Sequence, residues 1–189
     1  MLDHWGIDGR LSARTAFPVT LVGQTLFDPI GQQYNAGLDL VSSQPVYLFG
    51  RNCASALQAL GHISPNQSCP GGRALNPNAF KSVNSGLGDA PRNFVRGFGA
   101  WQMNITLRRD FPIHERLKLQ LRAETFNIFN HPNFGSINAD CGGTPGVPGC
   151  TNPLFGQATA TLANSLGTLN PLYQMGGPRS IQLALKVVF

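Results

Sequence analysis

Cysteine is the residue type in this sequence whose spacing most directly suggests chemistry. The four cysteines form two local pairs, Cys53 with Cys69 and Cys141 with Cys150, each among glycine, proline and asparagine residues. Neither pair has the C-x-x-C spacing of a zinc or redox site. The spacing therefore favours disulfides in an oxidising compartment over metal binding, although three pairings of the four thiols can be drawn.

The remaining reactive side chains do not predict an enzyme. Glu115 and Glu124 would be about 30 Å apart on one extended strand, too far for paired acid–base catalysis. No G-x-S-x-G, H-E-x-x-H, Walker or G-x-G-x-x-G pattern occurs. We expect no catalytic site, cofactor or metal ion, because the four histidines lie in four different predicted segments. These are His4, His62, His114 and His131.

The composition indicates strands and long loops. The 189 residues include 22 glycines and 14 prolines, and only 12% are charged, about half the usual share. The net charge is +5, but lysine and arginine are scattered singly, so no nucleic-acid partner is expected. No run approaches the roughly 20 apolar residues of a membrane helix. The start, MLDHWGIDGR, predicts no signal peptide, so an exported form would be part of a longer protein.

Four stretches alternate between apolar and polar residues, the pattern of a half-buried antiparallel strand. They cover residues 4–15, 99–111, 116–129 and 179–189. A short turn, 112–115, joins the second to the third, whereas the segments 16–98 and 130–178 are long loops. Within these loops we expect extra strands at 18–23, 45–50 and 155–162 and a short helix at 53–61.

Strand length and loop asymmetry favour a membrane barrel over a soluble sheet. A strand of about 11–13 residues rises roughly 36–43 Å, and a tilt near 40° reduces this to about 30 Å, the thickness of a bilayer core. Soluble strands typically have only about 5–6 residues. Membrane barrels also combine short turns on one side with long extracellular loops on the other. We therefore predict an all-β fold, an antiparallel meander of about four long strands that forms an incomplete arc of a transmembrane β-barrel.

The two faces of such an arc meet different surroundings, because the apolar face contacts lipid and the polar face lines the lumen. The residues expected to face lipid are Trp5, Ile7, Leu11, Trp101, Met103, Ile105, Leu107, Leu117, Leu119 and Leu121. Those expected to face the lumen are Arg10, Arg14, Arg108, Lys118, Arg122, Glu124 and Lys186. Only Arg109 breaks the apolar series of its strand. Aromatic girdles are expected at both rims, Trp5, Phe111 and Phe189 at one and Phe17, Trp101 and Phe129 at the other.

The last strand resembles a known signal. Every second residue from Ile181 to the end is apolar, and the final residue is aromatic. This resembles the C-terminal signal by which the bacterial assembly machinery recognises outer-membrane barrels, through pairing with an exposed strand edge. The residues of this predicted assembly signal are Ile181, Leu183, Leu185, Val187 and Phe189.

Longer stretches resemble one family. The runs 97–135, 155–162 and 178–189 resemble the C-terminal end of TonB-dependent outer-membrane receptors, in particular the Oar-like subgroup that carries a carboxypeptidase-regulatory-like domain. The segment LRAETFNIFNHPNF (121–134) is the most specific part, and GGRALNPNAF (71–80) matches the last long extracellular loop of that family. Within the run 97–135, the segment NHPNFG (130–135) is expected to be the start of a loop that ends the strand, with ligand binding as the alternative.

The resemblance implies a barrel of about 22 strands, of which this chain would supply the last four, and an internal plug domain outside this sequence. The expected partners are the rest of the barrel and its plug, TonB through an N-terminal part absent here, the assembly machinery and the lipid bilayer. The implied function is binding and import of a large nutrient across the bacterial outer membrane. This fragment alone would not transport.

The alternative is a secreted β-sandwich that serves as a disulfide-stapled binding or adhesion module. In a sandwich the apolar face packs on a second sheet. Leu107, Leu121 and Leu185 distinguish the two, because a second sheet covers them in the sandwich and leaves them bare in the barrel.

Overall fold

The computed structural model describes two compact units, and each is treated by itself. The described residues are 4–59, 61, 63–114, 117–167 and 175–189. The sheet unit comprises residues 1–15, 99–135 and 160–189, and the loop unit comprises residues 16–98 and 136–159. The loop unit therefore lies entirely within the two predicted long loops, 16–98 and 130–178.

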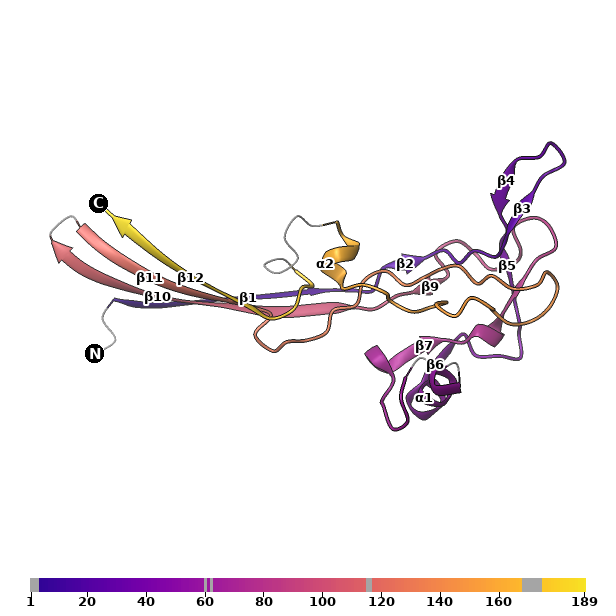
Figure 1. Cartoon of the computed structure of the whole chain (residues 1–189), viewed down its shortest axis with the longest axis horizontal. Helices are drawn as coiled ribbons and strands as arrows, with labels where there is room; N and C mark the ends of the chain where they lie inside the picture. The colour runs from indigo at the N-terminus through magenta and orange to yellow at the C-terminus, as the bar shows by residue number, and fades with distance from the viewer. Residues whose placement is uncertain (1–3, 60, 62, 115–116, 168–174) are drawn as a thin grey trace. The chain divides into compact units, whose positions relative to one another are not determined.

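Four long strands form the sheet unit. They lie side by side in the order β1 (Trp5–Arg14), β10 (Ala100–His114), β11 (Leu117–Phe126) and β12 (Ser180–Val188) (Figure 1). Each neighbouring pair is antiparallel. The alternating sequence specifies this register, since a slip of one residue would turn every apolar side chain to the other face. The predicted all-β antiparallel arc is confirmed, and within the described residues the arc does not close.

Two strand ends differ from the prediction for local reasons. Strand β10 continues to His114 through the predicted turn 112–115, with an irregularity in the pairing between Pro112 and His114. Proline lacks an N–H donor and is tolerated in strands at such bulges. Strand β11 ends at Phe126, earlier than expected, because Asn127 has φ 49° in the left-handed region. The early end explains why the apolar rhythm blurs after residue 125.

Short strand pairs make up the loop unit. They are β2 (Pro18–Val19) with β9 (Val95–Arg96), β3 (Thr25–Phe27) with β4 (Gln33–Asn35), β5 (Leu38–Leu40) with β8 (Phe80–Ser82), and β6 (Tyr47–Phe49) with β7 (Arg73–Leu75). The helical elements of this unit are α1 (Gly50–Ala59), η1 (Pro70–Gly72) and η2 (Pro77–Ala79), whereas α2 (Leu162–Ser165) belongs to the sheet unit. No helix among the described residues is long and apolar enough to cross a membrane.

The predicted extra elements are partly present. Strands β2 and β6 lie inside the segments 18–23 and 45–50, and α1 overlaps the predicted helix 53–61. The segment 155–162 forms no strand and contributes only isolated bridges before α2 begins. The strand pattern of 155–162 was therefore misleading, because two bridged residues do not make a ladder.

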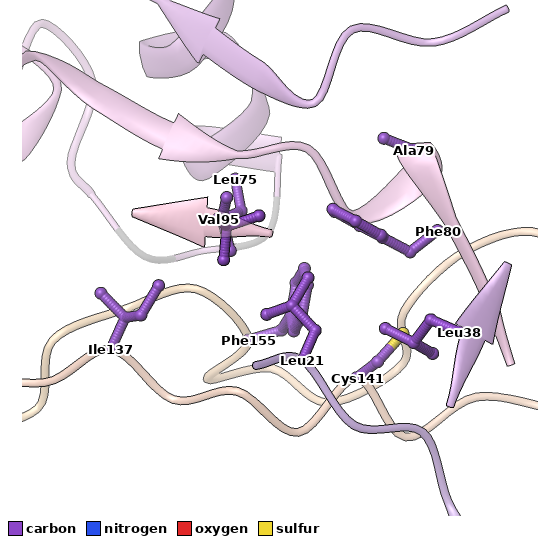
Figure 2. Packing of buried hydrophobic residues seen from close by; sticks show 9 residues of the cluster. All are labelled: Leu21, Leu38, Leu75, Ala79, Phe80, Val95, Ile137, Cys141 and Phe155. Carbon is purple, nitrogen blue, oxygen red and sulfur yellow. The ribbon is translucent and has the colours of Figure 1, made fainter. Parts of the chain in front are cut away.

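A hydrophobic core holds the loop unit together. Leu38, Phe80 and Val95 are completely buried, and the Phe80 ring packs edge-on against Phe155 with ring centroids 5.6 Å apart. Figure 2 shows these side chains gathered with Cys141 between strand and loop segments. Segments far apart in the sequence thus bury their apolar residues together, which the composition of the loops did not predict.

Candidate membrane-facing surface and buried amide network

The strand register gathers the residues predicted to face lipid on one face of the sheet unit. Ile7 lies opposite Leu107, Leu107 opposite Ala123, and Ala123 opposite Leu183, so one apolar row crosses all four strands. The same face carries Trp5, Leu11, Trp101, Met103, Ile105, Leu117, Leu119, Leu121, Ile181, Leu185 and Val187. The alternating residues therefore form one continuous apolar surface.

This apolar surface is bare. Leu107, Leu121 and Leu185 are 40%, 44% and 66% exposed, and the described strands of the sheet unit form a single four-stranded sheet. Soluble monomers rarely expose contiguous apolar patches of more than a few hundred Å². A sandwich would need a second sheet over these leucines, and the described strands of the sheet unit supply only one sheet.

Aromatic side chains lie towards both ends of the apolar surface. Trp101 packs against Phe129 at one end, with ring centroids 5.8 Å apart, and Trp5 and Phe111 lie towards the other. Trp101 and Phe111 are ten residues apart on β10. That separation is about 33 Å along a strand and about 25 Å across a bilayer at a tilt near 40°, the usual height of the apolar band of a barrel.

The opposite face carries the residues predicted to line a lumen. All seven of them occupy the alternate strand positions that project from this face. They are Arg10, Arg14, Arg108, Lys118, Arg122, Glu124 and Lys186. Arg108 forms an ion pair with Asp8 at 3.8 Å, and Gln120 Nε2 donates to Asp110 Oδ1 at 2.7 Å. Exposed ion pairs such as that of Arg108 with Asp8 contribute little stability, about 0–1 kcal/mol. Their main consequence is a hydrophilic surface that suits contact with water or other polar protein.

A buried asparagine fixes the end of β11. The Asn127 side chain is 1% exposed; its Nδ2 donates to the carbonyls of His131 and Gly177, both at 2.9 Å, and its Oδ1 accepts from His131 N at 3.0 Å. The Asn127 backbone N–H donates to Asn104 Oδ1 on β10 at 3.0 Å. Asn127 therefore ties together three segments: its side chain joins the turn after β11 to the segment before β12, and its backbone N–H joins them to β10.

Two further buried amides extend this network. Gln102, 2% exposed, donates from Nε2 to Asn104 Oδ1 at 3.1 Å and accepts from Gly176 N at 2.7 Å. Asn133, 4% exposed, accepts from Trp101 N at 2.9 Å. The polar groups of the segment NHPNFG are thus engaged in structural hydrogen bonds, in agreement with a strand-ending loop. Sequence reasoning missed this amide network because Gln102 and Gly176 are 74 residues apart. The sequence offers asparagine at positions 127 and 130 as a local signal, since asparagine tolerates the left-handed conformation that both residues adopt.

Comparison with known families decides the class of this sheet. The family model for the outer membrane beta barrel domain matches residues 1–182. The chain belongs to this family. Its place is therefore the bacterial outer membrane, and the bare apolar surface fits contact with lipid. No curated protein and no solved structure matches the chain.

The outer membrane barrel domain has two edge strands in the described arc. Strand β1 pairs only with β10, and β12 pairs only with β11. The predicted assembly signal lies on β12, where Ile181 and Leu183 are 64% and 72% exposed, and Phe189 follows at 96%. The backbone edge and the apolar side chains of this signal are both accessible in the described structure.

The loop unit of the barrel domain contains the cysteines in two disulfides. Cys53 in α1 bonds to Cys69, and Cys141 bonds to Cys150. No group of three histidine, cysteine, aspartate or glutamate side chains that could hold a metal occurs in the described part of the chain. His62 and Glu115 lie outside the described residues.

A hollow of about 540 Å³ opens in the loop unit of the barrel domain. Residues 20–22, 35–37 and 87–92 line it. One acidic residue of the rim, Asp89, is engaged through Oδ1, which accepts from Leu40 N at 2.6 Å. The volume falls within the range of about 300–1,000 Å³ that small-molecule sites occupy.

Proposed function

We propose that this chain is the C-terminal part of a TonB-dependent receptor that binds a large nutrient and imports it across the outer membrane. The observation that carries the proposal is an open arc with a bare apolar face, combined with the LRAETFNIFNHPNF segment of β11 and its turn. Binding and transport, not catalysis, is the proposed activity. This goes beyond the family assignment, which establishes only the barrel and its location.

The open edges support the idea of a larger barrel. The smallest membrane barrels have about 8 strands, so the four described strands need further strands to pair β1 and β12. In the proposal these come from the same receptor, and its plug occupies the lumen against Arg108, Arg122 and the other polar-face residues. TonB would contact the receptor through a part outside this chain. The chain alone would not transport.

The genome upstream of the Met1 codon offers the sharpest test of the receptor proposal. The expected result is one open reading frame that encodes a plug domain and a TonB-contacting segment before this chain. Purified full-length protein should then bind the periplasmic domain of TonB, whereas a protein truncated before the plug should not. A stop codon directly upstream, with no plug in the same frame, would overturn the proposal.

We further propose that the outer-membrane assembly machinery recognises β12 and the residue that follows it, Phe189. Alternate side chains of an added strand give specificity while its backbone gives affinity. Deletion of Phe189 from the complete protein should lower the inserted fraction, measured by heat-modifiable migration of the folded barrel in outer-membrane extracts. Val188→Ala is the matched control, because Val188 lies on the opposite face of β12. Equal insertion of the Phe189 deletion and the wild type would remove the assembly role.

A further inference from the structure

The apolar surface of the arc contains one fixed positive charge. Arg109 lies on β10 between Leu107 and Phe111, opposite Trp5 on β1 and Leu121 on β11. Its side chain is exposed. An arginine on the lipid face costs about 2–4 kcal/mol at the bilayer midplane but only about 0–1 kcal/mol near an interface. The depth of Arg109 in the bilayer therefore decides whether its charge is destabilising or can serve a binding site.

The strand geometry places Arg109 near a rim. The midpoint between Trp101 and Phe111 is residue 106, and Arg109 is three residues beyond it. Three residues rise about 10 Å along the strand and about 8 Å across the bilayer, out of a half-height of about 12 Å. A snorkelling arginine side chain can bridge the remaining distance of about 4 Å.

Two aromatic rings position the guanidinium. The Arg109 Cζ lies 5.0 Å from the centroid of the Trp5 ring and 4.6 Å from that of Phe111. No ion pair of Arg109 with a carboxylate occurs among the described residues, and the neighbouring Asp110 projects to the polar face, where it accepts from Gln120. The Arg109 guanidinium is thus positioned by two aromatic rings, and no carboxylate among the described residues pairs with it.

The end of the sheet identifies the leaflet. Strand β10 ends at His114 and β11 begins at Leu117, so their short connection lies at the same end as Arg109. Barrels place their short turns on the periplasmic side. Arg109 therefore faces the periplasmic leaflet.

We propose that Arg109, held by Trp5 and Phe111, binds the phosphate of an anionic phospholipid in the periplasmic leaflet. The planar guanidinium can donate two parallel hydrogen bonds to phosphate oxygens, which a lysine cannot reproduce. The acyl chains of the same lipid would lie along the apolar row below it. This site rests on the family assignment and the membrane location, not on nutrient import, so the two proposals can fail separately.

Lipid retention by the complete barrel tests the site. The protein is purified in detergent, offered equal amounts of phosphatidylglycerol and phosphatidylcholine, and examined by native mass spectrometry. Wild-type protein should retain phosphatidylglycerol preferentially. Arg109→Gln should lower that retention about fivefold, the equivalent of one cation near an anionic surface. Arg109→Lys should fall between the two, because it keeps the charge but loses the fork.

The matched control is Arg108→Gln, which removes the same charge from the adjacent residue on the polar face. Its retention of phosphatidylglycerol should equal that of the wild type. Excess inorganic phosphate should not displace the lipid, because the acyl chains also bind. Equal losses for the two glutamine variants, no loss for Arg109→Gln in a barrel shown to be folded by heat-modifiable migration, or displacement by free phosphate would each overturn the proposal.

Discussion

The long strands of the sheet unit and the core of the loop unit differ in the large side chains that they bury. In the loop unit the fully buried residues include Leu38 and Phe80, as in a water-soluble domain. On the long strands of the sheet unit a buried side chain is the amide of Gln102, whereas Leu183 is 72% exposed. This contrast is expected of a membrane barrel domain, because burial of apolar side chains stabilises a unit in water, whereas a strand in a bilayer presents such side chains to lipid. The kind of side chain that a strand buries therefore indicates whether the strand is suited to water or to a bilayer.

The largest expected difference concerns the apolar core of the loop unit. Phe80→Ala removes a completely buried ring that packs against Phe155, and such truncations typically cost about 3–5 kcal/mol. Amide hydrogen exchange around Val95 in the complete barrel should therefore accelerate strongly. Phe27→Ala is the control, since that ring is 65% exposed. Equal protection in the two variants would mean that the core described for the loop unit does not stabilise it.

A charged residue introduced in the middle of a long strand tests the sheet unit. Leu107→Arg introduces a guanidinium near the centre of the apolar band and should cost about 2–4 kcal/mol. Thr106→Arg, one residue earlier on the polar face, should cost much less, because Asp8 and Glu124 lie opposite it on the neighbouring strands. Urea titration of the complete barrel folded into phosphatidylcholine vesicles measures both changes. If Thr106→Arg proved the more damaging, the assignment of the two faces would be reversed.

The features that the sequence predicted are those with a local pattern. The strands around Ile7, Leu107 and Leu183 could be found because alternation with a period of two is visible within ten residues. The face on which each side chain projects then follows without knowledge of the fold. The end of β11 was predicted three residues too late, at residue 129, although the alternation already blurs where Asn127 turns the backbone to φ 49°.

The features that escaped prediction depend on distant partners. The segments 16–98 and 130–178 were expected to be long loops with a few short strands and one helix, yet Leu38 and Phe155 belong to one core. The structural partners of Asn127 were equally hidden, because Gly177 lies 50 residues away. A polar side chain in a loop carries no mark that distinguishes a buried structural amide from a solvated one.

Loss of the Asn127 side-chain hydrogen bonds alone should give a smaller effect than either change above, and two substitutions separate these bonds from backbone strain. Asn127→Gly keeps a residue suited to the left-handed conformation but deletes three side-chain hydrogen bonds; we expect a loss of about 1–3 kcal/mol in unfolding free energy. Asn127→Ala deletes the same bonds and adds left-handed strain of about 1–2 kcal/mol. Asn164→Ala, at an exposed position of the same unit, is the control.

Urea unfolding of the complete barrel in vesicles measures the order of these three variants. The amide network requires that Asn127→Ala be the least stable, Asn127→Gly intermediate and Asn164→Ala close to the wild type. A wild-type stability for Asn127→Gly would show that the turn, and not the amide, holds β10, β11 and the segment before β12 together. In that case backbone hydrogen bonds and lipid contacts would stabilise the sheet unit. The buried amides would then not play the stabilising part there that the apolar core around Phe80 plays in the loop unit.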